Sequence, residues 1–272
     1  MKKILLSLAI VLVVATAVAG GTLSFFSDTE TSTGNTFTAG AVDLTVDSTQ
    51  YYNGYACQNG IWINVYNPDH PQYPAGLPCD PASGNWQATD LGAEHQFFNF
   101  SDLKPGDSGV TGISLHVDND AWMRLVIKDI NDLDNSCTEP EEESSDSCTV
   151  VLPELQTPGA GELRENLQFS FWLDEGETPG FQGLSDPGEG DTILNYDEPY
   201  ILDQTISGSG VAYNLSDYLL YPYLVGGQTA YLGIWWYLPL ETGNEVQTDS
   251  MNATVEFQVE QHRNNPTPSF GA

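Results

Sequence analysis

The sequence predicts an all-β protein: an antiparallel β-sandwich with long loops and one or two short helices. The first observation is that apolar and polar residues alternate with a period of two along many segments, as they do in half-buried strands. The second is that Pro-Gly and Gly-Asn turn signals separate these segments. The third is that no β-α-β alternation occurs, which argues against a parallel α/β sheet.

The clearest strand patterns fall in six segments: 42–46, 113–117, 123–127, 167–173, 232–238 and 253–259. One stretch, 215–224, has the pattern of a helix, and Asn214 or Ser216 is placed to cap it. No internal repeat or composition break marks a second domain. We therefore expect a single sandwich domain over residues 41–263, followed by a disordered tail over 264–272.

Residues 1–24 have the features of a secretory signal peptide. Lys2 and Lys3 precede an apolar run that is short for a bilayer span. Small residues mark cleavage points after Ala19 and after Ser24, and the later one sets the expected start of the mature chain. A retained membrane anchor is the alternative, which the lack of basic residues after the run disfavours. We expect a secreted or cell-surface protein that meets the membrane only during export.

Segment 25–40 is Thr-rich and β-prone but carries few core-sized side chains. Thr29, Thr31 and Thr33 are β-branched and lack apolar bulk. Because such a strand cannot build a core of its own, it is either a mobile leader or a strand meant for another sheet.

The mature chain is strongly acidic. Beginning at Phe25, it carries 38 acidic residues and five basic ones, a formal net charge of −33. A field of this sign repels nucleic acid and anionic lipid head groups, so neither is expected as a partner. It suits a protein kept soluble in salt, or one whose assembly is bridged by cations.

Four cysteines follow the export signal, so disulfides are expected. Three pairings are possible for Cys57, Cys79, Cys137 and Cys148. The sequential pairing, Cys57–Cys79 with Cys137–Cys148, is favoured because each pair closes a loop-like stretch locally. A zinc site is the alternative, but no C-x-x-C spacing supports it.

Enzymatic motifs are absent, and we expect no catalytic residues. The four histidines never fall in an H-E-x-x-H pattern, and no G-x-S-x-G, Walker or dinucleotide motif occurs. Residues 106–109, Gly-Asp-Ser-Gly, resemble the nucleophile loop of trypsin-like proteases, but they follow Pro105 and are interpreted as a turn.

Two acidic segments are candidate calcium sites. In the first, Asp132, Asp134, Ser136 and Glu143 fall at positions 1, 3, 5 and 12 of an EF-like loop, but Cys137 stands where that loop needs glycine. The second segment lies on Gly/Pro turns, where solvated acidic loops are the alternative interpretation. Its candidate ligands are Asp174, Glu177, Asp186 and Asp191, with Glu175 and Glu189 nearby in the sequence.

Three Asn-x-Ser/Thr sequons could carry glycans in an exported protein. They begin at Asn99, Asn214 and Asn252.

Short motifs along the chain point to a known family. The specific ones are Gly-Gly-Thr at 20–22, Phe-Ser-Asp-Thr-Glu at 26–30, Asn-Thr-Phe-Thr-Ala-Gly at 35–40 and Val-Asp-Leu at 42–44. Supporting ones are Leu-Lys-Pro-Gly-Asp at 103–107, Trp-Tyr-Leu-Pro at 236–239, Gly-Asn at 243–244 and Phe-Gln-Val-Glu-Gln at 257–261. On these residues the chain resembles the TasA/camelysin family of secreted surface proteins, which a dedicated signal peptidase processes.

The resemblance implies a jelly-roll sandwich that polymerises by donor-strand complementation into biofilm-matrix fibres or pili. The N-terminal segment of one subunit would complete the sheet of the next, a contact that propagates head-to-tail. The partner is then another copy of the chain, with an anchoring or minor fibre protein as a further partner. The donor-strand residues would be Phe25, Phe26, Thr29, Thr31, Thr33 and Phe37.

Two alternatives stay open at this point. One is a camelysin-like surface metallopeptidase, which no recognisable motif supports. The other is a calcium-dependent surface or glycan-binding module. Its sugar platform would consist of exposed aromatic residues such as Tyr51, Tyr52, Trp62 and Trp86.

Overall fold

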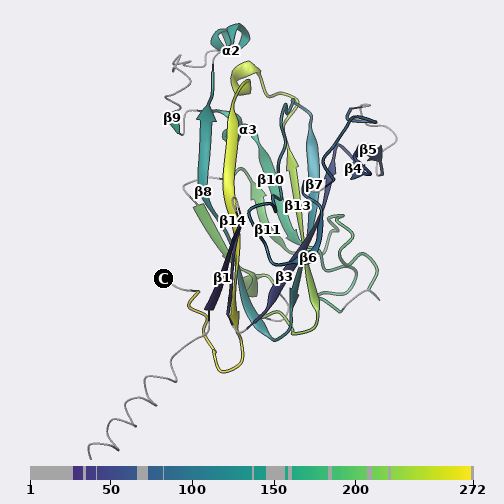
Figure 1. Ribbon diagram of the computed structural model, residues 1–272, viewed down its shortest axis with the longest axis vertical. Coiled ribbons are helices and arrows are strands. Elements are labelled where there is room, and N and C mark those ends of the chain that lie inside the picture. The colour runs from purple at the N-terminus through teal and green to yellow at the C-terminus, as the bar shows by residue number, and fades with distance from the viewer. Residues whose placement is uncertain are drawn as a thin grey trace, which may run out of the picture.

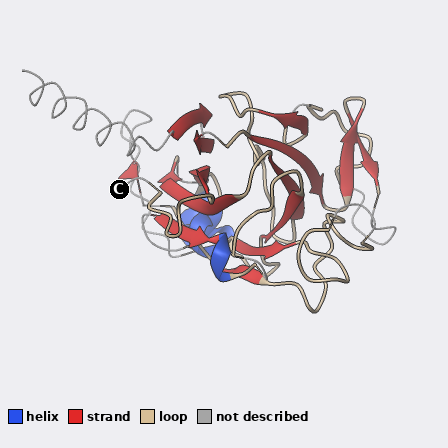
Figure 2. Ribbon diagram, turned by 90° about the horizontal axis from the view of Figure 1, so that it is seen from below, coloured by secondary structure: helices blue, strands red, loops and turns tan. Residues whose placement is uncertain are grey.

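The computed structural model describes residues 27–32, 35–40, 42–65, 73–81, 83–136, 138–144, 157–158, 161–182, 186–206, 210–219 and 222–270. Over these residues the chain forms two β-sheets that pack face to face, with long loops and only short helices (Figures 1 and 2). The predicted β-sandwich class is confirmed.

The first sheet has the strand order β1-β2-β14-β8-β12, and β9 also pairs with β8. β2 and β14 run parallel, whereas the other strand pairs described are antiparallel. The strands of this sheet are β1 (Ser27–Ser32), β2 (Asn35–Gly40), β8 (Ala121–Asp134), β9 (Thr157–Pro158), β12 (Gly210–Asn214) and β14 (Ser250–Gln261).

The second sheet has the order β11-β10-β13-β7-β3-β4-β5, and β6 also pairs with β3. Its strands are β3 (Leu44–Tyr52), β4 (Tyr55–Gln58), β5 (Ile61–Asn64), β6 (Trp86–Thr89), β7 (Ser108–Val117), β10 (Gln168–Leu173), β11 (Tyr200–Gln204) and β13 (Thr229–Tyr237).

The core lies between the two sheets, where the period-two pattern places it. Along β7, buried and half-buried residues alternate without a break, so that Ile113, Leu115 and Val117 all face inward. From the other sheet, Phe257 of β14 approaches Phe97, with ring centroids 6.1 Å apart. The remaining large buried apolar side chains include Met123, Leu125, Ile127, Phe171, Leu173, Leu232, Ile234 and Trp236.

Strand β10 departs from the alternation, because both of its faces are covered. Trp172, predicted on the opposite face from Phe171, is only 1% exposed. It pairs with Gly233 of β13, and a Cβ at that glycine would lie 2.0 Å from the indole ring. The glycine therefore provides the space that the tryptophan occupies.

Over the described residues the helices are α2 (Glu139–Glu143), α3 (Leu163–Asn166) and two 3₁₀ turns, η1 (Leu215–Asp217) and η2 (Asn244–Val246). The prediction of a helix over 215–224 is wrong beyond the first turn. Leu224 instead exchanges backbone hydrogen bonds with Ala121, at 2.8 and 2.9 Å, and so lies extended. None of the helices in the described ranges has the length and apolar character that crossing a bilayer requires.

The disulfide Cys57–Cys79 is present, as predicted, and it joins β4 to the loop after β5. Cys137 and Cys148 lie outside the described residues. Residues 104–107 form a turn, since the Asp107 N–H donates to the carbonyl of Lys104, and the Ser-Gly pair that follows begins β7. The buried Asp107 carboxylate accepts hydrogen bonds from the Tyr52 hydroxyl (2.6 Å) and from Asn53 (2.8 Å), so it holds the turn to β3.

The tail expected to be disordered is instead packed onto the first sheet as far as Phe270. Trp122 of β8 donates its indole N–H to the carbonyl of Asn265 (2.7 Å). The guanidinium of Arg124 lies 4.8 Å from the Phe270 ring centroid and donates to the Phe270 carbonyl. Phe270 is buried. These contacts give the tail fixed partners on β8.

Candidate assembly edge and acidic cluster

The N-terminal segment forms an antiparallel hairpin, β1–β2, rather than one continuous strand. Thr29 pairs with Thr38 and Thr31 with Thr36, while Phe37 lies opposite Glu30. Only residues 33–34, Thr-Gly in the sequence, lie between the two strands. Phe25, Phe26 and Thr33 lie outside the described residues.

The hairpin adds to the edge of the first sheet through β2 alone. Four residue pairs, 35–38 with 255–258, join β2 to β14 in parallel register. On its other side β14 pairs with β8. β14 would therefore be an edge strand if the hairpin were elsewhere, with its backbone N–H and C=O groups open to pairing.

The chain passes from one sheet to the other immediately after the hairpin. β2 ends at Gly40 in the first sheet, and β3 begins at Leu44 in the second. Between them, the side chain of Val42 is fully buried in the core. Val42 thus anchors the chain where it leaves the hairpin and enters the sandwich. The hairpin pairs with β14 in the first sheet, whereas the chain continues into β3 in the second sheet.

Basic residues lie beside this edge, on the outer face of β8. Arg124 donates from Nε to the side-chain oxygen of Gln258 (2.7 Å), and Lys128 forms an ion pair with Glu256. Glu256 and Gln258 occupy two of the β14 positions that pair with β2. Two of the five cations of the mature chain therefore stabilise the strand at which the N-terminal segment docks.

A separate feature lies at the other end of the sandwich. There the end of β8, the helix α2 and the turn before β14 meet (Figure 1), and the carboxylates of Asp134, Glu141 and Asp249 converge. One oxygen from each lies within 4.8 Å of the others, and among the described residues this is the group of acidic, His or Cys side chains that could hold a metal ion.

Local structure positions each of these carboxylates. Glu141 is fully buried and accepts the Thr138 N–H (2.8 Å), which begins α2 in the manner of a capping box. Asp249 accepts the N–H groups of Glu162 (2.6 Å) and Leu163 (3.0 Å) with Oδ2, at the start of α3. Asp134 is the last residue of β8.

Burial and mutual repulsion disfavour the ionised form of the carboxyl groups in and beside this acidic cluster. Burial raises the pKa of Asp249 to about 6, and repulsion from Asp132 and Asp134 adds to this effect. Burial likewise raises the pKa of Asp132, which is 5% exposed, although a backbone hydrogen bond from Arg164 and the charge of Arg164 oppose the shift. Several carboxylates thus share a partly desolvated site.

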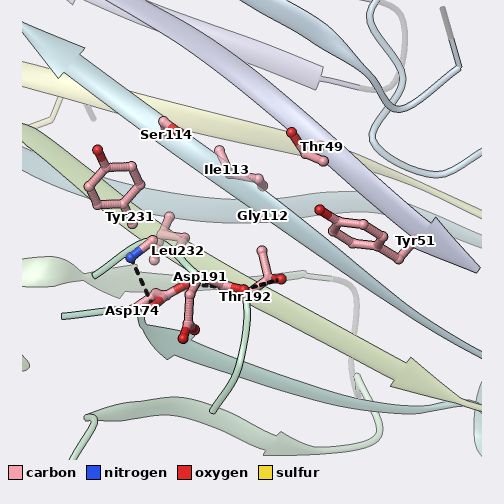
Figure 3. Close-up of a pocket in the computed structure, with 11 residues that line it drawn as sticks. Thr49, Tyr51, Gly112, Ile113, Ser114, Asp174, Asp191, Thr192, Tyr231 and Leu232 are labelled. Carbon is pink, nitrogen blue, oxygen red and sulfur yellow. Dashed lines mark hydrogen bonds between the residues drawn. The ribbon is translucent and has the colours of Figure 1, made fainter. Parts of the chain in front are cut away.

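The second acidic segment, which supplied the predicted calcium ligands, is organised differently. Asp174 accepts the N–H groups of Gly190 (3.1 Å) and Thr192 (2.8 Å), beside a cavity of about 230 Å³ (Figure 3). Asp186 accepts the Thr178 N–H (2.9 Å), Asp191 accepts the Ile193 N–H (2.7 Å), and Glu177 is exposed. Three of the four predicted ligands therefore hold loop backbone instead of converging on one point.

Within this second segment, Asp174 has the carboxyl pKa that is shifted furthest from its ordinary value. Burial raises its pKa to about 7, and repulsion from Glu198 and Asp191 adds to the shift, against the hydrogen bonds that it accepts. Glu175 and Glu198 are also buried, and burial raises the pKa of each.

The aromatic residues proposed as a sugar platform are largely committed to packing. Tyr52 is buried and stacks on Phe100 and Trp236, with ring centroids 5.2 and 5.9 Å away. Trp86 packs against Phe97 and donates to the carbonyl of Val46. The three sequon asparagines, Asn99, Asn214 and Asn252, are all exposed.

Sequence reasoning found part of the acidic cluster and missed the rest. Asp132 and Asp134 were recognised, but Glu143 is exposed and Ser136 uses its carbonyl to accept from Thr248. Glu141 carried a detectable signal, the Thr-x-x-Glu capping pattern that begins at Thr138. Asp249 carried none, because its approach to Asp134 depends on the pairing of β14 with β8.

These features define a β-sandwich protein whose N-terminal segment is added to the edge of a sheet. Residues 1–57 match the family model of the camelysin metallo-endopeptidases, which confirms the resemblance predicted from the sequence. The match covers the predicted signal peptide, the hairpin and the chain as far as Cys57 in β4. The comparison with curated proteins found no match.

The family description implies a metal, and the acidic cluster does not fit a catalytic zinc. Catalytic zinc sites usually include histidine, whereas this cluster contains carboxylates alone. The described histidines are held elsewhere: His95 accepts from Gly92, His116 lies between Asp47 and Thr229, and His262 stacks on Tyr223. His70 lies outside the described residues. We derive no peptidase step from this site.

Proposed function

We propose that the chain is secreted and acts as a non-enzymatic structural subunit, which polymerises head-to-tail into extracellular fibres or pili through its N-terminal segment. The observation that carries the proposal is the placement of the β1–β2 hairpin. It joins the sandwich as an edge addition, by a parallel ladder between β2 and β14. The Cys57–Cys79 disulfide is consistent with an oxidising, extracellular location.

Backbone pairing of this kind transfers readily between molecules. The ladder uses main-chain hydrogen bonds, so a second copy of the segment can occupy the same β14 edge with the same bonds. The described core begins at Val42, which anchors the sandwich side of the connection. If the segment of each subunit docks on the next, the contact does not close on itself, and it propagates as a filament.

The first prediction concerns this ladder. β2 is flanked by β1 and β14, so a proline at a position paired on both sides, such as Thr36, removes a hydrogen bond from one ladder or the other. We expect the Thr36→Pro variant to lose filament formation, seen by electron microscopy, and a chain that starts at Gly40 to behave in the same way. Thr36→Ser is the matched control, which keeps the backbone donor and should form filaments normally.

The stability of the sandwich separates failed assembly from failed folding. Thermal unfolding of Thr36→Pro, at concentrations below those needed for assembly, should still show one cooperative transition. Filaments of normal length and number from the chain that starts at Gly40 would contradict the proposal.

A surface peptidase is the second candidate, because the matched family is described as a metallo-endopeptidase family. It requires that the purified protein cleave a generic substrate such as casein, and that a chelator abolish the cleavage. Inactivity at protein concentrations that form filaments would remove this candidate.

A further inference from the structure

We propose that Asp134, Glu141 and Asp249 form a Ca²⁺ site, with Asp132 as a fourth carboxylate beside it. The site joins three segments that are distant in sequence: the end of β8, the helix α2 and the turn that leads into β14. It lies away from the β14 positions that receive the hairpin, so the proposal stands independently of polymerisation.

The distances fit one ion. Oxygens bound to Ca²⁺ lie about 2.3–2.6 Å from it, so two ligands on opposite sides are separated by roughly 5 Å. The three oxygens here lie within 4.8 Å of one another and can all reach one central cation.

A second observation points to a ligand at this place. Asp132 is 95% buried, and its Oδ1 has no hydrogen-bond partner among the described residues. The Oδ1 of Asp249 also has none there. A buried carboxylate oxygen without a donor is costly, and a cation would satisfy it.

The unpartnered oxygen of Asp132 lies close to one member of the cluster. A Cβ placed on Gly161 would lie 3.0 Å from Asp132 Oδ1 and 3.1 Å from Asp249 Cγ. Both carboxylates therefore border Gly161, whose lack of a side chain lets them approach its backbone closely.

The donor set selects the class of ion. All the ligands are carboxylate oxygens, which are hard donors, and neither imidazole nor thiolate belongs to the group. Such a set prefers Ca²⁺ over zinc or copper. Bound Ca²⁺ would fasten the helix α2 and the start of β14 to the end of β8.

The test is a Ca²⁺ titration of the full exported chain after chelator treatment, followed by calorimetry and thermal unfolding at constant ionic strength. Extracellular calcium modules bind with Kd values of about 10⁻⁴–10⁻³ M. At about 10 mM Ca²⁺, linkage then predicts a rise in Tm on the order of 3–10 °C. We expect Mg²⁺ to give a smaller rise.

Two variants locate the ion, and one controls for charge. Asp249→Asn and Asp134→Asn should each weaken Ca²⁺ binding by about tenfold or more and remove most of the Tm rise. Asp134→Asn is included because Asp249 also holds the start of α3 and its loss could destabilise the fold. Asp186→Asn makes the same charge change in the second acidic segment, and it should keep wild-type affinity.

Other results would overturn the proposal. One is an equal rise in Tm with NaCl of matched ionic strength, which would reduce the effect to screening. Another is wild-type affinity in both Asp134→Asn and Asp249→Asn. A loss of binding in Asp186→Asn alone would move the site to the second acidic segment.

Discussion

Asp174 holds its loop with a carboxylate that burial makes reluctant to ionise. Its pKa in the folded protein, about 7, lies above the ordinary value of 3.8 for an aspartate, so the folded state binds the proton more tightly than the unfolded chain. The stability that this proton contributes is complete below about pH 4 and is lost as the pH rises through 7. We therefore expect the Tm of the wild type to fall between pH 5 and pH 8 by more than that of Asp174→Asn.

The difference between the two proteins is the measured quantity, because the other carboxylates also repel one another more strongly at high pH. Asparagine is neutral at every pH and resembles the protonated carboxyl, so the Tm of Asp174→Asn should lack the fall that ionisation of Asp174 causes in the wild type. Asp197→Asn, an exposed position in the same loop region, controls for the change in charge. Parallel Tm curves for wild type and Asp174→Asn would show that Asp174 does not carry this proton.

At the scale of elements, the C-terminal tail is a strap across β8 whose anchor is Phe270. Burial of a phenylalanine side chain stabilises by about 1.5–3 kcal/mol, and its contact with the Arg124 guanidinium adds to this. We expect Phe270→Ala to lower the free energy of unfolding by about 2 kcal/mol in urea titrations.

Ser269→Ala is the control for this prediction. It removes a hydroxyl hydrogen bond to Glu260 (3.2 Å) but keeps the backbone donor, so it should change stability by less than about 0.5 kcal/mol. Wild-type stability in Phe270→Ala would mean that the tail contributes nothing to the fold in solution.

The strands were predictable because burial on one face imposes a period of two, as β3 and β7 show. The helix expected after Asn214 was not, because the outcome there depends on a tertiary contact: Leu224 pairs with Ala121 and is held extended. The same holds for the tail, whose Pro-rich composition suggests disorder although Trp122 and Arg124 supply partners for it.

The residues of the candidate site were likewise predictable from the sequence only in part. Local spacing identified Asp132 and Asp134, and local capping chemistry could have identified Glu141. The approach of Asp249 follows from the register of β14 against β8, which includes a shift between Asn252 and Thr254. A sequence does not display that register, so the cluster could be completed only from the three-dimensional arrangement.

At the scale of the whole molecule, charge sets the conditions for assembly. A mature subunit with 38 acidic and five basic residues carries a net charge of −33, and two such subunits repel when they meet. The attraction in the proposed contact is short-ranged, because it consists of backbone pairing and burial. Repulsion acts over a Debye length, about 30 Å at 0.01 M salt and 3 Å at 1 M.

We therefore expect filament growth, followed by light scattering at fixed protein concentration, to accelerate by at least tenfold between about 0.05 and 1 M NaCl. KCl should act equally, since screening depends on ionic strength and not on the identity of the ion. The Asp249→Asn variant should respond to NaCl as the wild type does, because it leaves the β14 edge unchanged. Growth that is independent of monovalent salt but requires Ca²⁺ would show that ion bridging, rather than screening, overcomes the repulsion between subunits.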